Sequence, residues 1–104
     1  MFKLADSTFD RRQTVVSQDG ACYLVSTIER PEYRLGFSRI RYETMVFPCD
    51  REGNVHSYLE RYTEYYDTEN EAINGHTFVC KGITDGEIIV PPPYSYEDEE
   101  DSDD

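Results

Sequence analysis

The sequence predicts an α+β fold: a four-stranded antiparallel meander sheet with one C-terminal helix packed on one face, followed by a disordered acidic tail. Three observations support this prediction. Segments rich in β-branched and aromatic residues occupy most of the chain between residues 13 and 66. The apolar period then changes from two residues to about 3.6, which is typical of a helix. Acidic residues are concentrated after residue 96.

The four strands are predicted from runs in which apolar and polar side chains alternate. Residues 18–20 separate the first two runs and form a hairpin signal. A loop that carries Pro31 and Gly36 leads to the third run, which Pro48 closes, and residues 50–54 supply the next turn. The predicted strands cover residues 13–17, 21–28, 38–47 and 55–66.

The predicted helix begins with a capping box formed by Thr68 and Glu71. In this motif the threonine hydroxyl accepts from the glutamate amide, and the glutamate carboxylate accepts from the threonine amide. We expect Gly82 to end the helix. Side chains at helical spacing would face the sheet: Ala72, Ile73, His76, Val79, Cys80 and Ile83.

The chain of 104 residues is long enough for one domain and too short for two ordinary cores. We place a single small α+β domain at residues 1–90 and a proline-rich, acidic, disordered tail at residues 91–104. Residues 91–93 are prolines, which cannot donate to a strand ladder, so residues 88–90 are the last that can dock on a core. Seven of the 22 acidic residues lie in the tail, so the body carries -5 of the net charge of -12.

The charge and the cysteines limit the classes of partner and compartment. An acidic body repels nucleic acid and anionic membranes, so we expect neither as a direct partner and expect a protein with a basic surface. No segment approaches the roughly 20 apolar residues that span a bilayer, and no signal peptide follows Met1. Cys22, Cys49 and Cys80 cannot all pair within one chain, which favours reduced thiols and a cytoplasmic location.

A zinc site is the most specific chemical constellation in the sequence. His76 and Cys80 lie four residues apart on the predicted helix, while Cys49 and His56 bracket the preceding turn. Six residues separate Cys49 from His56, however, where zinc hairpins have about two to four. The competing interpretation is a buried thiol and a hydrogen-bonded histidine beside the sheet. We therefore predict no metal and no other cofactor.

Catalytic groups are only weakly indicated. Cys49 and Cys80 lack the glycine-rich turn or helix N-terminus that activates a thiolate nucleophile. Glu43, Glu60 and Glu64 have the chemistry for acid–base catalysis, but carboxylates on a strand face usually pair with arginines. The sequence has no phosphate-binding glycine loop, zincin motif or dinucleotide fingerprint. We predict that the protein is not an enzyme.

A surface of tyrosines and carboxylates is the predicted site of partner binding. In a strand over residues 55–66, Tyr58, Tyr62 and Tyr66 would share one side with the glutamates between them, a combination that protein interfaces favour. The competing interpretation places these tyrosines beneath the helix. The predicted partner-binding residues are Tyr58, Glu60, Tyr62, Glu64, Tyr66, Glu43, Glu97 and Asp98.

Part of the chain resembles a family of small bacteriophage and prophage proteins of unknown function. The resembling segments are YETMVF at residues 42–47, RY at 61–62, YDTENEA at 66–72 and GH at 75–76, within about a third of the chain. The resemblance implies a strand, a returning strand and a capped helix, and it assigns no catalytic residue. The acidic extension over residues 94–104 lies outside it.

For a phage-encoded chain, the resemblance implies an accessory protein that binds and inhibits or modulates a host factor in the host cytoplasm, for anti-defence or host takeover. Its acidic surface and tail would then bind a basic groove in a fast, salt-sensitive association. Two alternatives stay open: an acidic nucleic-acid mimic that blocks a DNA- or RNA-binding protein, and a small ligand- or metal-binding domain. A homo-oligomer is also allowed, since symmetric interfaces can create pockets.

Overall fold

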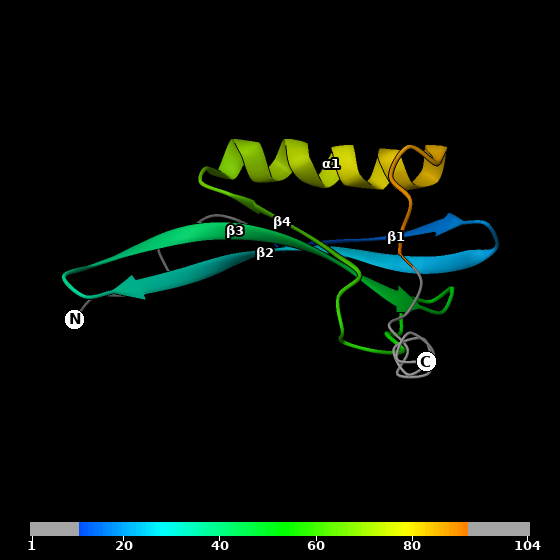
Figure 1. The fold of residues 1–104 in the computed structure, drawn as a ribbon, viewed down its shortest axis with the longest axis horizontal. Helices are drawn as coiled ribbons and strands as arrows, with labels where there is room; N and C mark the ends of the chain where they lie inside the picture. Colours follow the sequence, from blue (N-terminus) through cyan, green and yellow to red (C-terminus); the bar gives the residue numbers. More distant parts are fainter. Residues whose placement is uncertain (1–10, 92–104) are drawn as a thin grey trace, which may run out of the picture.

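The structure, a computed structural model, describes residues 11–91 and confirms the predicted α+β fold (Figure 1). Four antiparallel strands form one open sheet in the order β1-β2-β3-β4, and one helix lies across one face. The predicted tail lies outside the described residues except for Pro91. The elements are β1 (Arg12–Gln18), β2 (Ala21–Arg34), β3 (Phe37–Cys49), β4 (Tyr62–Tyr66) and α1 (Glu69–Asp85).

The second and third strands are longer than the sequence predicts. β2 continues through Pro31 and turns at Gly36, which has a φ of 93°, so the predicted loop is wrong. Hydrogen-bonded and non-hydrogen-bonded pairs alternate along an antiparallel ladder, and the pair that closes this two-residue turn, Arg34 and Phe37, is hydrogen-bonded. Pro31 therefore sits at a non-hydrogen-bonded pair, where its missing N–H removes no bond from the β2–β3 ladder.

The far ends of β2 and β3 form a two-stranded arm, residues 28–34 and 37–41, that extends beyond the rest of the sheet (Figure 1). The paired part of β1 begins opposite Thr27, and β4 ends opposite Tyr42, so neither strand reaches the arm. Among residues 11–91, no third strand therefore pairs alongside the arm. The arm gives the molecule its elongated dimensions of 54 × 32 × 23 Å.

The predicted capping box is present at the start of α1. Thr68 Oγ1 accepts from the Glu71 amide at 3.1 Å, and Glu71 Oε1 accepts from the Thr68 amide at 3.3 Å. The predicted end at Gly82 is wrong, because the helix continues past it and is capped by Gly86 with a φ of 81°. Gly82 instead makes room for packing, since a Cβ there would overlap the side chain of Ile88.

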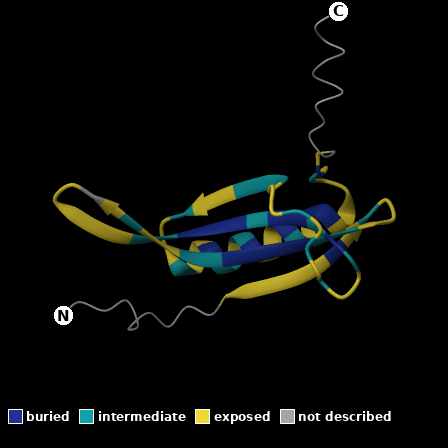
Figure 2. Cartoon of the chain, turned by 90° about the horizontal axis from the view of Figure 1, so that it is seen from below, coloured by how far each residue is buried: buried dark blue, intermediate teal, exposed yellow. Residues whose placement is uncertain are grey.

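The core lies between α1 and the face of the sheet that the helix covers. Gln18 on β1 forms hydrogen bonds with the end of the helix and the segment that follows it. Its Nε2 donates to the carbonyls of Ile83 and Ile88, and its Oε1 accepts from the Val90 amide. This confirms that residues 88–90 dock on the core. The buried side chains of the core are Val16, Val25, Val46, Val79, Ile83 and Val90 (Figure 2).

A loop over residues 50–61 covers part of the other face of the sheet (Figure 1). Asp50 organises its first turn by accepting from the amide and the side chain of Asn54, as predicted for residues 50–54. The Tyr58 ring then packs edge-on against Phe47, with 5.4 Å between ring centroids. The predicted strand over residues 55–66 is therefore wrong in its first half, because the chain leaves the sheet edge to cover Phe47 and returns as β4.

Candidate functional site

Three of the predicted partner-binding residues lie on β4, on the side that faces the helix. Tyr62 packs against the core, and Tyr66 lies against Gly75 of α1. Glu64, between them, accepts a hydrogen bond from the Tyr62 hydroxyl at 3.0 Å. Burial and then this hydrogen bond raise the pKa of Tyr62 to about 12. Tyr62 and Tyr66 are thus partly engaged in packing, as the competing interpretation of the sequence expected.

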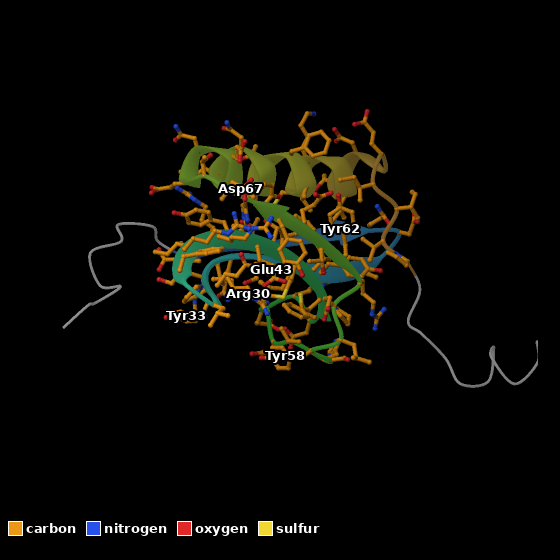
Figure 3. All side chains as sticks on the ribbon, turned by 60° about the vertical axis from the view of Figure 1, so that its left-hand side comes forward. Arg30, Tyr33, Glu43, Tyr58, Tyr62 and Asp67 are labelled. Atoms are coloured by element: carbon orange, nitrogen blue, oxygen red, sulfur yellow. The ribbon has the colours of Figure 1, made fainter. Side chains whose placement is uncertain are left out.

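The other predicted partner-binding residues lie elsewhere. Tyr58 and Glu60 are exposed in the loop over residues 50–61, and Tyr58 lies on the far side of the sheet from the helix (Figure 3). Glu43 also faces away from the helix, and only 3% of it is exposed. Glu97 and Asp98 lie outside the described residues. The expectation that the three tyrosines share one side of a strand is therefore wrong.

Glu43 belongs to a charged cluster at the base of the arm (Figure 3). Its carboxylate accepts from Arg30 at 2.8 Å. The Arg41 guanidinium lies 3.3 Å from the Asp67 carboxylate and over the Tyr65 ring. Acidic and basic side chains alternate in this cluster, and their ion pairs connect the segments at the base of the arm. Neither sign of charge is concentrated there. A cleft of about 190 Å³ there is lined by Arg30, Glu32, Arg41 and Tyr65.

The four residues of the predicted zinc constellation do not come together. His76 and Cys80 lie between α1 and the sheet. Cys49 and His56 line a shallow cleft of about 500 Å³ at the end of the sheet beside the residue 50–61 loop. Because the sheet separates the two pairs, they cannot share one tetrahedral ion. In the described part of the chain, no three histidine, cysteine or acidic side chains are grouped as metal ligands.

The expectation of a hydrogen-bonded histidine beside the sheet is confirmed at His76. Its Nε2 lies 2.9 Å from the Thr14 hydroxyl, and its Nδ1 lies 2.7 Å from the Thr27 hydroxyl. The Thr27 hydroxyl is also 2.6 Å from that of Thr44. Burial and then the charge of Arg12 lower the pKa of His76. The imidazole of His76 therefore links α1 directly to β1 and β2, and to β3 through the hydroxyl of Thr27.

The tip of the arm exposes three large apolar side chains, Tyr33 at 68%, Leu35 at 102% and Phe37 at 55%, which we call the tip cluster (Figure 2). Each lies within two residues of Leu35 at the turn, and the register places Tyr33 and Phe37 on opposite faces of the arm, so apolar side chains lie on both sides of its end. Phe78, on the helix, is equally exposed at 67% but lies on the body of the molecule.

The sequence predicts a loop over residues 29–37, so the tip cluster is not among the predicted binding residues. The turn is indicated by Leu35 and Gly36, which lie between two segments that mix charged and apolar residues. Residues equally distant from that turn are partners in the ladder. Recognising it would also have paired Thr27 with Thr44 and Cys22 with Cys49.

No known family model, curated protein or solved structure matches this chain. The described residues contain no helix with the length and apolarity needed to cross a bilayer. Function is therefore inferred from the chain's own geometry.

Proposed function

We propose that this protein is a small accessory protein that acts by binding another protein, and that the tip cluster is the centre of the surface that the partner contacts. The resemblance to small phage and prophage proteins makes a host factor the proposed partner. The protein would inhibit or modulate that factor in the host cytoplasm, without catalysing a reaction.

The exposure of the tip cluster is the observation that supports this proposal. Leu35 is fully exposed, and Tyr33 and Phe37 are more than half exposed, although burial of such side chains is worth about 1.5 to 3 kcal/mol each. Apolar side chains that are exposed together mark interaction surfaces, and aromatic residues in particular carry binding energy there. A partner that covers the tip cluster would bury these side chains, and the free energy of their burial would stabilise the complex.

The rest of the arm is suited to presenting the tip. An isolated two-stranded hairpin is only marginally stable in water. Here the hairpin continues into the core, and Arg39 donates to Glu32 across the two strands at 2.7 Å. The apolar tip is thus bordered by paired charges, which matches the apolar centre and polar rim of protein interfaces.

The net charge supports a partner with a basic surface. The formal charge of -12 is large for 104 residues and favours fast encounter with a positively charged protein. On the arm itself, acidic and basic side chains pair with one another. We therefore assign recognition to the tip cluster and long-range attraction to the acidic residues of the whole chain.

A rigid nucleic-acid mimic has less support. Such a mimic needs unpaired carboxylates at fixed, phosphate-like spacing. Within residues 11–91, Glu43 is paired with Arg30, and Glu32 is paired with Arg39. These ion pairs reduce the negative potential of the face on which they lie.

Photo-crosslinking from the tip tests the proposal. Phe37 is replaced by the photoreactive analogue benzoylphenylalanine in the full chain, which is expressed in bacterial cells and irradiated. We expect a discrete covalent adduct with one host protein, because the ring of residue 37 would lie against the partner. The adduct is detected as a band of higher mass and identified by mass spectrometry.

Phe78 provides the matched control, since it is the same residue type with similar exposure on the body of the molecule. The analogue at position 78 should give no such adduct. Equal labelling from both positions, or labelling from position 78 alone, would show that the tip is not the contact surface.

A further inference from the structure

Two of the three cysteines are direct partners in the β2–β3 ladder. Cys22 lies opposite Cys49, at the end of the hairpin farthest from the tip. Both side chains point to the face away from the helix, since Phe47, two residues before Cys49, contacts Tyr58 there. Both thiols line the shallow cleft at the end of the sheet and are free.

The register places the two thiols within reach of a bond. Along β2, Cys22 lies an even number of positions, 12, from Arg34 of the hydrogen-bonded pair at the turn, so Cys22 and Cys49 are a hydrogen-bonded pair as well. The Cα atoms of such a pair are about 5.5 Å apart. Disulfides form at Cα separations of about 4.4 to 6.8 Å, so the Cα spacing of this pair lies within the range that a disulfide spans.

We propose that Cys22 and Cys49 form a cross-strand disulfide by exchange with a small-molecule disulfide such as oxidised glutathione, which makes this pair a redox-modification site. The assignment depends on the register and on the cleft, and not on what the arm binds.

The difference in burial sets the order of the two exchange steps. Cys22 is half-buried, whereas Cys49 is only 4% exposed, and burial raises the pKa of the Cys49 thiol. Cys22 is therefore the thiol that meets the small disulfide, and Cys49 is the thiol that resolves the adduct.

Each step forms one sulfur–sulfur bond and breaks one. The Cys22 thiolate attacks one sulfur of the small disulfide, which gives a mixed disulfide and releases a thiolate. The Cys49 thiolate then attacks the Cys22 sulfur and releases the second thiolate. The two cysteine thiols lose two electrons to the small disulfide, and their two protons pass to the released thiolates. The products are the Cys22–Cys49 disulfide and two small thiols.

The predicted bond is readily reduced. Side chains directly opposite on antiparallel strands have Cβ atoms about 4.5 to 5.5 Å apart, and the larger values belong to hydrogen-bonded pairs. Disulfides have a mean Cβ separation of about 3.8 Å. Closing the bond therefore strains the two strands, and strained disulfides are the easily reduced ones.

Cys80 provides an internal contrast. It packs against the core beneath α1, on the other side of the sheet, and burial raises the pKa of its thiol. It has no cysteine opposite it. We therefore expect Cys80 to stay reduced under conditions that oxidise the other two.

The experiment uses the folded, fully reduced chain in neutral buffer with oxidised glutathione. Free thiols are then alkylated, and the chain is cut with trypsin, which cleaves after lysine and arginine but not before Pro31. The three cysteines then lie in the separate peptides 13–34, 42–51 and 62–81. We expect peptides 13–34 and 42–51 to be joined and peptide 62–81 to be alkylated, which leaves one free thiol per chain in place of three. Adding reduced glutathione should reopen the bond.

Two variants complete the test. Cys49→Ser should stop at a glutathione adduct on Cys22, because the resolving thiol is gone. Cys80→Ser retains the pair and should form the same bond at the same rate. Far-UV circular dichroism confirms that each variant is folded. The proposal is overturned if the folded wild-type chain keeps glutathione on Cys22 without closing the bond, links either cysteine to Cys80, or does not react.

Discussion

Replacing Gly75 with valine should lower the free energy of unfolding by about 2 to 3 kcal/mol, the cost of overpacking a well-packed site. A Cβ at Gly75 would overlap the ring and the hydroxyl of Tyr66, which lies between β4 and the helix. Helix propensity predicts the opposite sign, because valine is a better helix former than glycine. The sign of the change, measured by urea denaturation, therefore separates the packing account from propensity.

Two further variants test whether the Tyr66 contact is the cause. Asn74→Val places the same side chain on the exposed neighbouring position and should change the free energy of unfolding by less than about 0.5 kcal/mol. In a double-mutant cycle with Tyr66→Ala, the valine at position 75 should become much less destabilising. Simple additivity of the two single changes would show that the two residues do not interact.

The free energy of unfolding should also fall as the pH is lowered from about 7 to about 5, by up to about 1.4 kcal/mol per pH unit. Burial first, and then Arg12, lower the pKa of His76 in the folded protein. As the pH falls below the ordinary pKa of histidine, His76 binds a proton in the unfolded chain but not in the folded protein. The equilibrium therefore shifts toward unfolding. The free energy of unfolding is therefore largest above the ordinary histidine pKa. It decreases as the pH falls toward the lower pKa that His76 has in the folded protein.

His56 is the matched control, because it is exposed at the end of the sheet. His76→Gln should remove most of this pH dependence, and His56→Gln should leave it unchanged. Urea denaturation of both variants at several pH values provides the measurement. A pH dependence that persists in His76→Gln would place its source in other groups.

The strand order and the helix start could be predicted because each has a local cause. Asp19 and Gly20 have the positive φ values that a tight hairpin turn requires, and both are residues that tolerate them. Thr68 and Glu71 satisfy the first amides of the helix through the capping box. The hairpin turn and the capping box depend only on residues that are neighbours in the sequence, so both can be recognised without knowledge of the tertiary structure.

The arm could not be predicted from the same signals. Alternation of apolar and polar residues indicates a strand with one buried face. No element within residues 11–91 covers residues 29–39, and most of their described side chains are exposed. Pro31 is tolerated because it occupies a non-hydrogen-bonded position. Gly82 was wrongly predicted to end the helix, because this glycine instead leaves space for the side chain of Ile88.

The partner-binding residues predicted from the sequence do not lie together in the structure, and none of them belongs to the tip cluster. Tyrosines and carboxylates were expected together on one strand, whereas the loop over residues 50–61 carries Tyr58 to the opposite face, onto Phe47. That displacement depends on contacts between distant parts of the chain, which periodicity does not encode. The tip cluster and the Cys22–Cys49 pair both follow from the position of one turn, at Leu35 and Gly36.

The most direct test of the central claim is the affinity of the crosslinked host protein for two purified variants. One variant replaces the tip cluster, Tyr33, Leu35 and Phe37, with serine, and the other replaces three equally exposed apolar residues, Leu59, Phe78 and Ile89. Loss of the tip should weaken binding by about 100-fold or more, since interface anchors contribute about 1 to 2 kcal/mol or more each. The control variant should bind within about threefold of the wild type. Equal losses in the two variants, or a tip variant with unchanged affinity, would contradict the assignment of the arm as the binding surface.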